Sequence, residues 1–242
     1  MPLRSPRTVT HRARRYPLDV LPPLFESVPD VFAARFEFVA PWTLLGEALT
    51  QVLASLHSTN AGTVSTSAHL SGDGIVIGEG THIHPTAVIE GPVFIGRDVD
   101  IRPGAYIRGG TWIGDHCVVG TNTEIKHSIL FPHAKAPHLN YVGDSVLGAN
   151  VNLGAGTVLS NFRHDGKNIR IPVAHTSIDT GCRKLGAVLG DGVLTGCNAV
   201  LHPGTIVGRE TQVYPGVQLR PGVYPADSIV KLRQELDIHS KT

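Results

Sequence analysis

The sequence has little of what marks several common classes of protein. Aromatic residues make up 6% of its 242 residues, methionine occurs once, and there are three widely spaced cysteines. Cysteines so spaced form neither a disulfide framework nor a CxxC metal site. No apolar run approaches the ~18 residues of a transmembrane helix, and no signal-peptide core is visible. We therefore expect a soluble, cytoplasmic protein.

Neither sign of charge predominates. Lysine and arginine number 21 and aspartate and glutamate number 20, which leaves a net charge of +1. This balance argues against a general nucleic-acid-binding or membrane-surface protein. Glycine, with 27 residues, and proline, with 17, are abundant. Together with the few charged and aromatic residues, they favour many short strands joined by turns.

An aliphatic residue recurs at every sixth position through much of the chain. The longest run has no gap and consists of Ile77, Ile83, Ile89, Ile95, Ile101, Ile107, Ile113, Val119 and Ile125. The period returns in a new phase at Leu147, Leu153 and Leu159, and again between Leu189 and Leu219. So regular a repeat predicts one structural unit for each six residues.

A period of six fits neither a helix, which repeats every 3.6 residues, nor a strand, which repeats every 2. It fits short strands joined by turns, with one aliphatic side chain in each unit pointing to a common axis. Coils of this kind stack and pair through backbone hydrogen bonds about 4.8 Å apart. The repeat therefore predicts an all-β fold, a parallel β-helix.

The repeat resembles that of left-handed hexapeptide β-helix proteins. The resemblance implies three strands in each coil, a triangular prism and left-handed crossovers, which depart from the usual handedness of parallel connections. It also implies a homotrimer with sites between neighbouring prisms. The period by itself establishes neither the handedness nor the trimer.

The regions outside the repeat suggest four parts. The first is rich in arginine and proline with no acidic residue before Asp19, which predicts a basic solvated arm, with a transit peptide as the alternative. A predicted helix from Pro41 to about His57 would cap the open end of the prism. The expected organisation is an arm at 1–37, a helical cap at 38–70, the β-helix at 71–222 and a tail at 223–242.

The period breaks twice, which predicts loops near 127–140 and 160–186. Loops that leave one face of a repeat array often carry binding sites. Around them, residues 124–144 read EIKHSILFPHAKAPHLNYVGD and residues 149–167 read ANVNLGAGTVLSNFRHDGK. Their HL-YVGD, NVN-GAGT and N-x5-K elements resemble the acetyltransferase domain of the bifunctional UDP-N-acetylglucosamine pyrophosphorylase/glucosamine-1-phosphate N-acetyltransferase.

A further stretch, DTGCRKLGAVLGDGV at residues 179–193, looks more like the archaeal branch, the sugar-1-phosphate nucleotidylyltransferase/acetyltransferases. The likeness covers roughly Ile75 to Lys231. Phe162 replaces a tyrosine of the family, so one hydroxyl is lost. Nothing in residues 1–70 resembles the nucleotidyltransferase domain, so we expect no uridylyltransferase activity.

The resemblance implies an N-acetyltransferase that moves acetyl from acetyl-CoA, a co-substrate, to the amine of an amino-sugar 1-phosphate, glucosamine 1-phosphate first. The amine must lose a proton to attack the thioester, and imidazole, with an ordinary pKa of about 6.5, suits that task. His138 matches the base of the family, and Asn161 matches the residue that orients the amine or the base. Attack would be direct, because no activated serine or cysteine nucleophile is apparent. Acyl transfer itself requires no metal.

The substrate-binding residues are carried over in the same way. Tyr141 and Asn152 match positions that hold the sugar, and Lys126 and Lys167 match cations near its phosphate. The family positions for CoA fall near Cys197, Pro215 and Lys231. Asn152 is also compatible with a turn cap or a stacked asparagine ladder inside the prism.

Two arginines compete for the phosphate. Arg102 lies in an Arg-Pro-Gly-Ala string like that of the family, whereas Arg108 precedes Lys126 by three repeats of six, which make one full coil. That spacing puts Arg108 and Lys126 at the same corner of adjacent coils, so we favour Arg108. As lone cations, Arg108 and Lys126 are equally compatible with a solvated surface.

Two other functions fit parts of the pattern. One is a zinc site resembling γ-class carbonic anhydrases, because His133 and His138 are five residues apart and His116 or His127 is available as a third ligand. The other is a non-catalytic trimeric scaffold or regulatory subunit that partners a separate nucleotidyltransferase. Neither explains the asparagine and lysine string.

Overall fold

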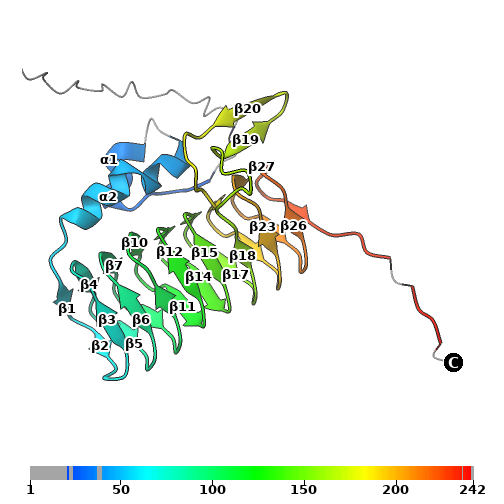
Figure 1. Ribbon diagram of the computed structural model, residues 1–242. Coiled ribbons are helices and arrows are strands. Elements are labelled where there is room, and N and C mark those ends of the chain that lie inside the picture. Colours follow the sequence, from blue (N-terminus) through cyan, green and yellow to red (C-terminus); the bar gives the residue numbers. More distant parts are fainter. Residues whose placement is uncertain (1–20, 22–23, 37–39, 236, 241–242) are drawn as a thin grey trace, which may run out of the picture.

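The computed structural model describes residues 21, 24–36, 40–235 and 237–240. Most of the chain winds as coils of three short parallel strands, so that three sheets run side by side along a prism (Figure 1). We call these sheets A, B and C in the order in which the chain meets them. The predicted left-handed parallel β-helix is confirmed.

Each sheet receives one strand from each coil. Sheet A consists of β1 (Thr59–Asn60), β4 (Ile75–Ile77), β7 (Val93–Ile95), β10 (Thr111–Ile113), β13 (Ile129–Leu130), β16 (Val146–Leu147), β21 (Ala187–Leu189), β24 (Thr205–Val207) and β27 (Gly222–Tyr224). Sheet B consists of β2 (Thr63–Val64), β5 (His82–Ile83), β8 (Asp100–Ile101), β11 (Val118–Thr121), β14 (Lys135–His138), β17 (Asn152–Leu153), β22 (Leu194–Thr195), β25 (Gln212–Val213) and β28 (Ile229–Val230). Sheet C consists of β3 (His69–Ser71), β6 (Val88–Glu90), β9 (Tyr106–Ile107), β12 (Glu124–Lys126), β15 (Tyr141–Gly143), β18 (Val158–Leu159), β23 (Val200–Leu201) and β26 (Gln218–Leu219).

The repeating aliphatic residues form the core of the prism. Those from Ile77 to Ile125, and those of the later phases, are buried together in one hydrophobic cluster. In sheet A, Ile95 pairs with Ile113, which lies three repeats further along the chain and one coil along the prism. One such side chain in each strand therefore fills the axis, as the period of six predicts.

The loop predicted at 127–140 is absent, because these residues form β13 and β14 and pair in register. Here each coil is one residue shorter than a regular coil, since Ile113 pairs with Leu130 and Leu130 with Leu147. The missing residue lies at the C–A corner, by which we mean the turn from each sheet C strand to the next sheet A strand. Shortening this corner changes the spacing of aliphatic residues from six to five, which breaks the sequence period without breaking the prism.

The second predicted interruption is an insertion at the same corner, between β18 and β21. It contains an antiparallel hairpin, β19 (Arg170–Val173) and β20 (Thr176–Asp179). Ile169, Ile171 and Ile178 of this insertion are buried. The insertion is thus a packed element with a hydrophobic side.

The helical segment was predicted to cap the open end of the prism. It lies instead along the outer face of sheet A (Figure 1). It consists of α1 (Asp30–Phe36), the 3-10 helix η2 (Pro41–Leu45) and α2 (Glu47–Ala54). Trp42, Leu49 and Phe32 pack in one cluster with Trp112 of β10 and Ile171 of the insertion. Sheet A is therefore covered on both faces, which explains why its outward residues are also apolar.

The ends of the prism differ from the predicted boundaries. Strands begin at Thr59, before the predicted start at residue 71, and continue to Val230, beyond the predicted end at 222. α1 falls within the predicted arm at 1–37, most of which lies outside the described residues. None of the helices in the described ranges is long and apolar enough to cross a membrane.

Candidate functional site

Seven polar residues gather at the C–A corner, where the coils depart from their regular length, and on the adjoining outer face of sheet C. We call this group the polar corner, and it consists of Arg108, Glu124, Lys126, His127, Tyr141, Asp144 and Asn161. Strand pairing brings them together. Lys126 of β12 pairs with Gly143 of β15, and its neighbour Ile125 pairs with Ile107 of β9. The group therefore spans four successive coils.

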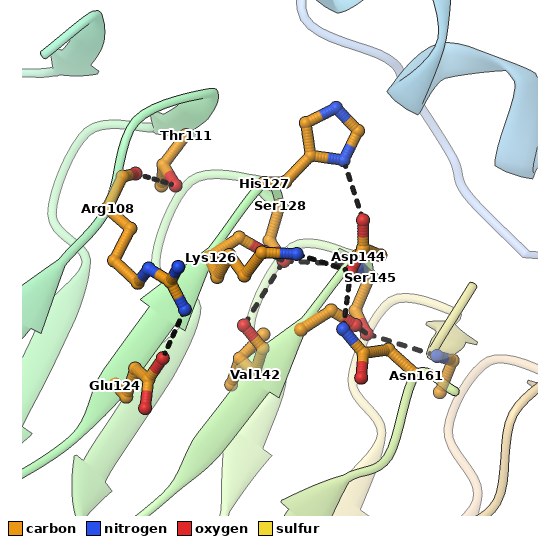
Figure 2. A network of polar contacts seen from close by, with 12 residues as sticks. Arg108, Thr111, Glu124, Lys126, His127, Ser128, Val142, Asp144, Ser145 and Asn161 are labelled. Carbon is orange, nitrogen blue, oxygen red and sulfur yellow. Dashed lines mark hydrogen bonds and ion pairs between the residues drawn. The ribbon is translucent and has the colours of Figure 1, made fainter. Parts of the chain in front are cut away.

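Asp144 is the centre of the polar corner (Figure 2). Its carboxylate accepts hydrogen bonds from Asn161 Nδ2 at 2.5 Å and Lys126 Nζ at 3.2 Å, and its other oxygen lies 3.0 Å from His127 Nδ1. Only 8% of its side chain is exposed. Burial alone would raise the pKa of this carboxyl, but the hydrogen bonds from His127 and Asn161 and the charge of Lys126 lower it below its ordinary value.

Arg108 lies one coil before Lys126, as the spacing in the sequence predicted. Its guanidinium donates to Glu124 Oε1 at 3.0 Å, and its carbon atom Cζ lies 5.8 Å from the centre of the Tyr106 ring. Arg102, the alternative, is at a different corner and donates to Asp100 at 2.8 Å. The structure therefore associates Arg108, and not Arg102, with Lys126.

The Tyr141 ring lies on the outer face of sheet C beside these groups. Burial raises the pKa of its hydroxyl, the negative charges of Glu124 and Asp144 raise it further, and a hydrogen bond with Asn161 opposes them. A Cβ atom at Gly143 would lie 2.6 Å from the tyrosine hydroxyl and 2.7 Å from Asn161 Nδ2. Glycine is thus required for the hydroxyl and the amide to meet over the strand.

A second set of predicted residues forms a column at the B–C corner, the turn from each sheet B strand to the next sheet C strand. Backbone hydrogen bonds link successive coils here. The Gly156 N–H donates to the His138 carbonyl, the Asn198 N–H to the Ala155 carbonyl, and the N–H of Gly216, next to Pro215, to the Cys197 carbonyl. The His138 side chain is exposed. Lys231 follows β28 at the same corner, with its Nζ 5.0 Å from the centre of the Tyr214 ring. We call His138, Ala155, Cys197, Pro215 and Lys231 the corner column; all of them except Ala155 were predicted from the sequence.

Two predicted residues join neither group. Asn152 lies on the outer side of sheet B and pairs with Lys135 and Leu194, so it takes no part in an asparagine ladder. Lys167 is exposed in the insertion, where its backbone N–H donates to Asp165. The structure does not bring either side chain into contact with the polar corner.

Sequence reasoning missed Asp144, Glu124 and Asn140 as functional or supporting residues. Asn140 is buried, accepts a hydrogen bond from the His138 backbone N–H, and donates to the Gly154 carbonyl at 2.8 Å. It thereby fixes the backbone beside His138. The signal was present, because Asn140 and Asp144 stand within the HLNYVGD string, but their burial was not visible from it.

The histidines of the zinc alternative do not converge in one chain. His116 and His133 stack on each other, with ring centres 4.7 Å apart, at the corner between sheets A and B. His138 lies at the B–C corner, on the far side of β14 from His133. Among the described residues, no three His, Cys, Asp or Glu side chains are grouped so as to hold a metal ion.

The fold and its repeat define a left-handed hexapeptide β-helix protein, with a polar corner and a corner column on either side of sheet C. Within that class, the chain belongs to the GMPPB C-terminal domain family, whose model matches residues 89–223.

Named relatives point to the same region. The chain is 44% identical over 98 residues to a bifunctional sugar-1-phosphate nucleotidylyltransferase/acetyltransferase of Sulfurisphaera tokodaii, covering 40% of this chain and 24% of that protein. It is 33% identical over 201 residues to the bifunctional protein GlmU of Methanococcus aeolicus, covering 83% of this chain and 48% of that protein. The chain therefore spans half or less of these relatives. The predicted resemblance is confirmed.

Among solved structures, the chain is similar to an Arabidopsis UDP-N-acetylglucosamine acyltransferase, with 13% identity and a TM-score of 0.41. The match covers 69% of this chain and 70% of that one.

Proposed function

We propose that this chain is a CoA-dependent acyltransferase that transfers acetyl from acetyl-CoA to the amine of an amino-sugar 1-phosphate, with glucosamine 1-phosphate as the first candidate. The relative from Sulfurisphaera tokodaii is named as an acetyltransferase, and it is similar to this chain over 98 residues. The observation that carries the proposal is the convergence of Arg108, Lys126, Tyr141 and Asn161 at one corner.

In the proposed reaction, the amine nitrogen attacks the thioester carbonyl, the new C–N bond forms and the C–S bond breaks. His138 takes the proton that the amine loses, and the leaving CoA thiolate takes up a proton as thiol. A positioned base of this kind contributes about 10²–10⁴-fold to the rate. Asn140 supports this role, because its two hydrogen bonds hold the backbone on which His138 is carried.

The acceptor would lie across sheet C with its phosphate at the polar corner. Arg108 and Lys126 supply charge and donors, as a phosphate monoester requires. Both cations are already held in place by carboxylates, Glu124 and Asp144, so little side-chain freedom is lost when the phosphate binds. Lys167 would approach from the insertion, and Asn152, on the outer side of sheet B, would contact the sugar bound by a neighbouring prism of the trimer proposed below.

The CoA molecule would follow the corner column from His138 toward Cys197, Pro215 and Lys231. Sheet C separates the column from the polar corner by strands of two or three residues, or about 7–10 Å at ~3.3 Å per residue. An acceptor anchored at one edge can therefore present its amine to a thioester at the other. Lys231 would meet a phosphate of CoA at the end of the column.

We also propose a homotrimer, in which neighbouring prisms contact each other through sheet B and the B–C corner. Four large apolar residues on these surfaces leave between 41% and 61% of their area exposed, namely Leu139, Leu194, Tyr214 and Ile229. The outer face of sheet A is already covered by helices and the insertion. Sedimentation or light scattering of the full chain would give the mass of the assembly.

Thiol release from acetyl-CoA with glucosamine 1-phosphate and galactosamine 1-phosphate tests the proposed activity. Turnover with either sugar establishes the reaction class and the preferred sugar. No turnover in folded protein, with metal content measured in parallel, would reject the proposal in favour of a zinc enzyme or a scaffold. A scaffold would in addition copurify with a separate nucleotidyltransferase.

A further inference from the structure

The insertion at the C–A corner and the adjoining coils of the prism form an open pocket that none of the predicted roles uses. We call it the insertion pocket, and its cavity volume is about 490 Å³. The residues on which the argument depends are Phe162, Arg163, His164, Val200, His202 and Pro203. This volume lies within the ~300–1,000 Å³ typical of sites for small molecules.

The lining combines a flat apolar surface with a polar rim of Arg163, His164 and His202, to which Asp165 adds one carboxylate. Phe162 leaves 44% of its surface exposed, although a large aromatic side chain gains free energy when it is covered. Arg163 is fixed at the rim by two hydrogen bonds to the Asp165 carboxylate, at 2.9 and 2.7 Å. His164 and His202 add nitrogen atoms able to donate to an anion. The pocket therefore fits a ligand that carries both a planar ring and phosphate groups.

The insertion pocket lies further along the same edge of the prism as the polar corner. Lys126 and Gly143 are the last residues of β12 and β15, and Ser160 and His202 directly follow β18 and β23. Strand pairing places each of these four residues one coil beyond the last. Ser160 and His202 both line the pocket. At about 4.8 Å for each coil, His202 lies about 14 Å along the prism from Lys126. A phosphate chain that begins at Lys126 can therefore lead into the pocket.

We propose that the insertion pocket binds the nucleoside diphosphate part of a nucleotide-linked amino sugar, so that the acceptor is larger than a sugar 1-phosphate. The base stacks on Phe162, and the second phosphate approaches His202 and Arg163. This inference rests on the proposed acetyl transfer, because it names the acceptor of that same site. It also explains why the insertion emerges at the C–A corner, directly beside the phosphate-binding cations.

Binding of UDP and GDP to the full chain, measured by calorimetry, tests the pocket without any reaction. At least one of them is expected to bind saturably, and Phe162→Ala to weaken that binding about tenfold or more, because loss of one stacking partner has an effect of this size. Phe162→Tyr keeps the ring and is expected to bind as the wild type does. His202→Ala is expected to weaken binding several-fold, while His175→Ala at the hairpin tip leaves it unchanged. No binding of either nucleotide, or equal binding by Phe162→Ala, overturns the proposal.

Thiol release then distinguishes the acceptors. The ratio kcat/KM is expected to be higher for UDP-linked or GDP-linked glucosamine than for glucosamine 1-phosphate, and Phe162→Ala is expected to lower only the former. Equal or better use of the sugar 1-phosphate, or an equal loss for both acceptors, overturns the assignment of the pocket. No thiol release with any acceptor, in protein that binds UDP or GDP, rejects the acetyl transfer alone and retains the nucleotide site.

Discussion

The two corners that border sheet C are built in opposite ways. At the B–C corner, one residue in each coil stacks on the next, and His138 in this column is exposed. At the C–A corner, the two turns that contain His127 and Asp144 are each one residue shorter than the regular turn. The next turn at this corner carries the insertion. The side chains there bond to one another, with Asp144 buried among them.

The difference shows what a regular repeat can and cannot make. A uniform column offers the same backbone spacing along its length, which suits an extended ligand but not a compact charge. A closed group of charges needs side chains from several coils to approach one centre, and the shortened turns achieve this. The predictions that follow test whether the two corners have separate roles.

The largest expected effect is at the column. His138→Ala is expected to lower kcat for acetyl transfer by about 10²–10⁴-fold, because a general base is lost. The thermal midpoint should not change, since the side chain is exposed. Steady-state thiol release is the measurement, with His175→Ala as the matched control. Equal rates in wild type and His138→Ala would remove His138 from the role of base.

Asp144→Asn should affect the polar corner in both folding and function. The amide replaces one acceptor oxygen by a donor facing Lys126 or Asn161, which is expected to lower the free energy of unfolding by about 1–3 kcal/mol. Asparagine tolerates the positive φ of 45° at this position. Chemical denaturation measures the change, and Asp98→Asn, at another positive-φ corner, should differ from wild type by less than about 0.5 kcal/mol. Equal stability of the two variants would contradict the central role of Asp144.

The same carboxylate should give stability a distinctive dependence on pH. Its pKa is lowered in the folded state, so its contribution is complete above the unfolded pKa of about 3.9 and is lost as pH falls through the lower folded value. Wild type should therefore lose stability in this acid range more steeply than Asp144→Asn. Thermal midpoints of both proteins between neutral and acid pH give the comparison. Parallel curves would show that Asp144 is not held ionised by its neighbours.

Lys126→Met should act on acceptor binding. The KM for glucosamine 1-phosphate is expected to rise about tenfold, as loss of one charged hydrogen bond of ~1.5 kcal/mol implies. The KM for glucosamine without phosphate should change little, so the ratio of the two is the informative quantity. Lys184→Met, an exposed cation outside the proposed binding groups, serves as the control. An equal rise for both acceptors would assign Lys126 to general stability of the site.

The smallest effect is expected at the end of the column. Lys231→Ala should raise the KM for acetyl-CoA about two- to fivefold, because an exposed ion pair contributes ~0.2–1 kcal/mol. With acetyl-CoA that lacks its 3′-phosphate, the variant and the wild type should have the same KM. A difference that persists with this analogue would show that Lys231 contacts another part of CoA.

The sequence predicted the prism well because its core depends on one side chain in each strand. Ile77 to Ile125 reported both the fold and the register directly. The period failed at Lys126 to Ser128, where the turn is one residue shorter, since a change of phase looks the same as a loop in sequence. The position of the helices was also predictable in part, because Phe94, Trp112 and Ile129 are outward residues of sheet A and yet apolar.

The site was predicted less completely. The count of residues in a coil aligned Arg108 with Lys126, because in the unbroken part of the repeat each residue pairs with the one 18 positions away. It could not show that Asp144 would be buried and ionised, since that depends on Lys126, His127 and Asn161 arriving from different coils. The path of the insertion depends on its packing against the helices and not on any repeat, so the pocket beside it was not predictable either.

The helical segment that covers sheet A has a consequence for the order in which the molecule folds. Within the prism, strand contacts join each coil to the next one along the chain, so each coil can form as soon as the previous one exists. The contacts between the segment before the prism and the prism itself join residues much further apart in the sequence. The Glu26 backbone N–H donates to Asp191, 165 residues away, and the Glu26 side chain pairs with Arg209. Contacts of high sequence separation form slowly. The prism is therefore the template on which residues 24–36 and 40–56 dock, and the contacts of Glu26 can form only after Asp191 and Arg209 have been synthesised.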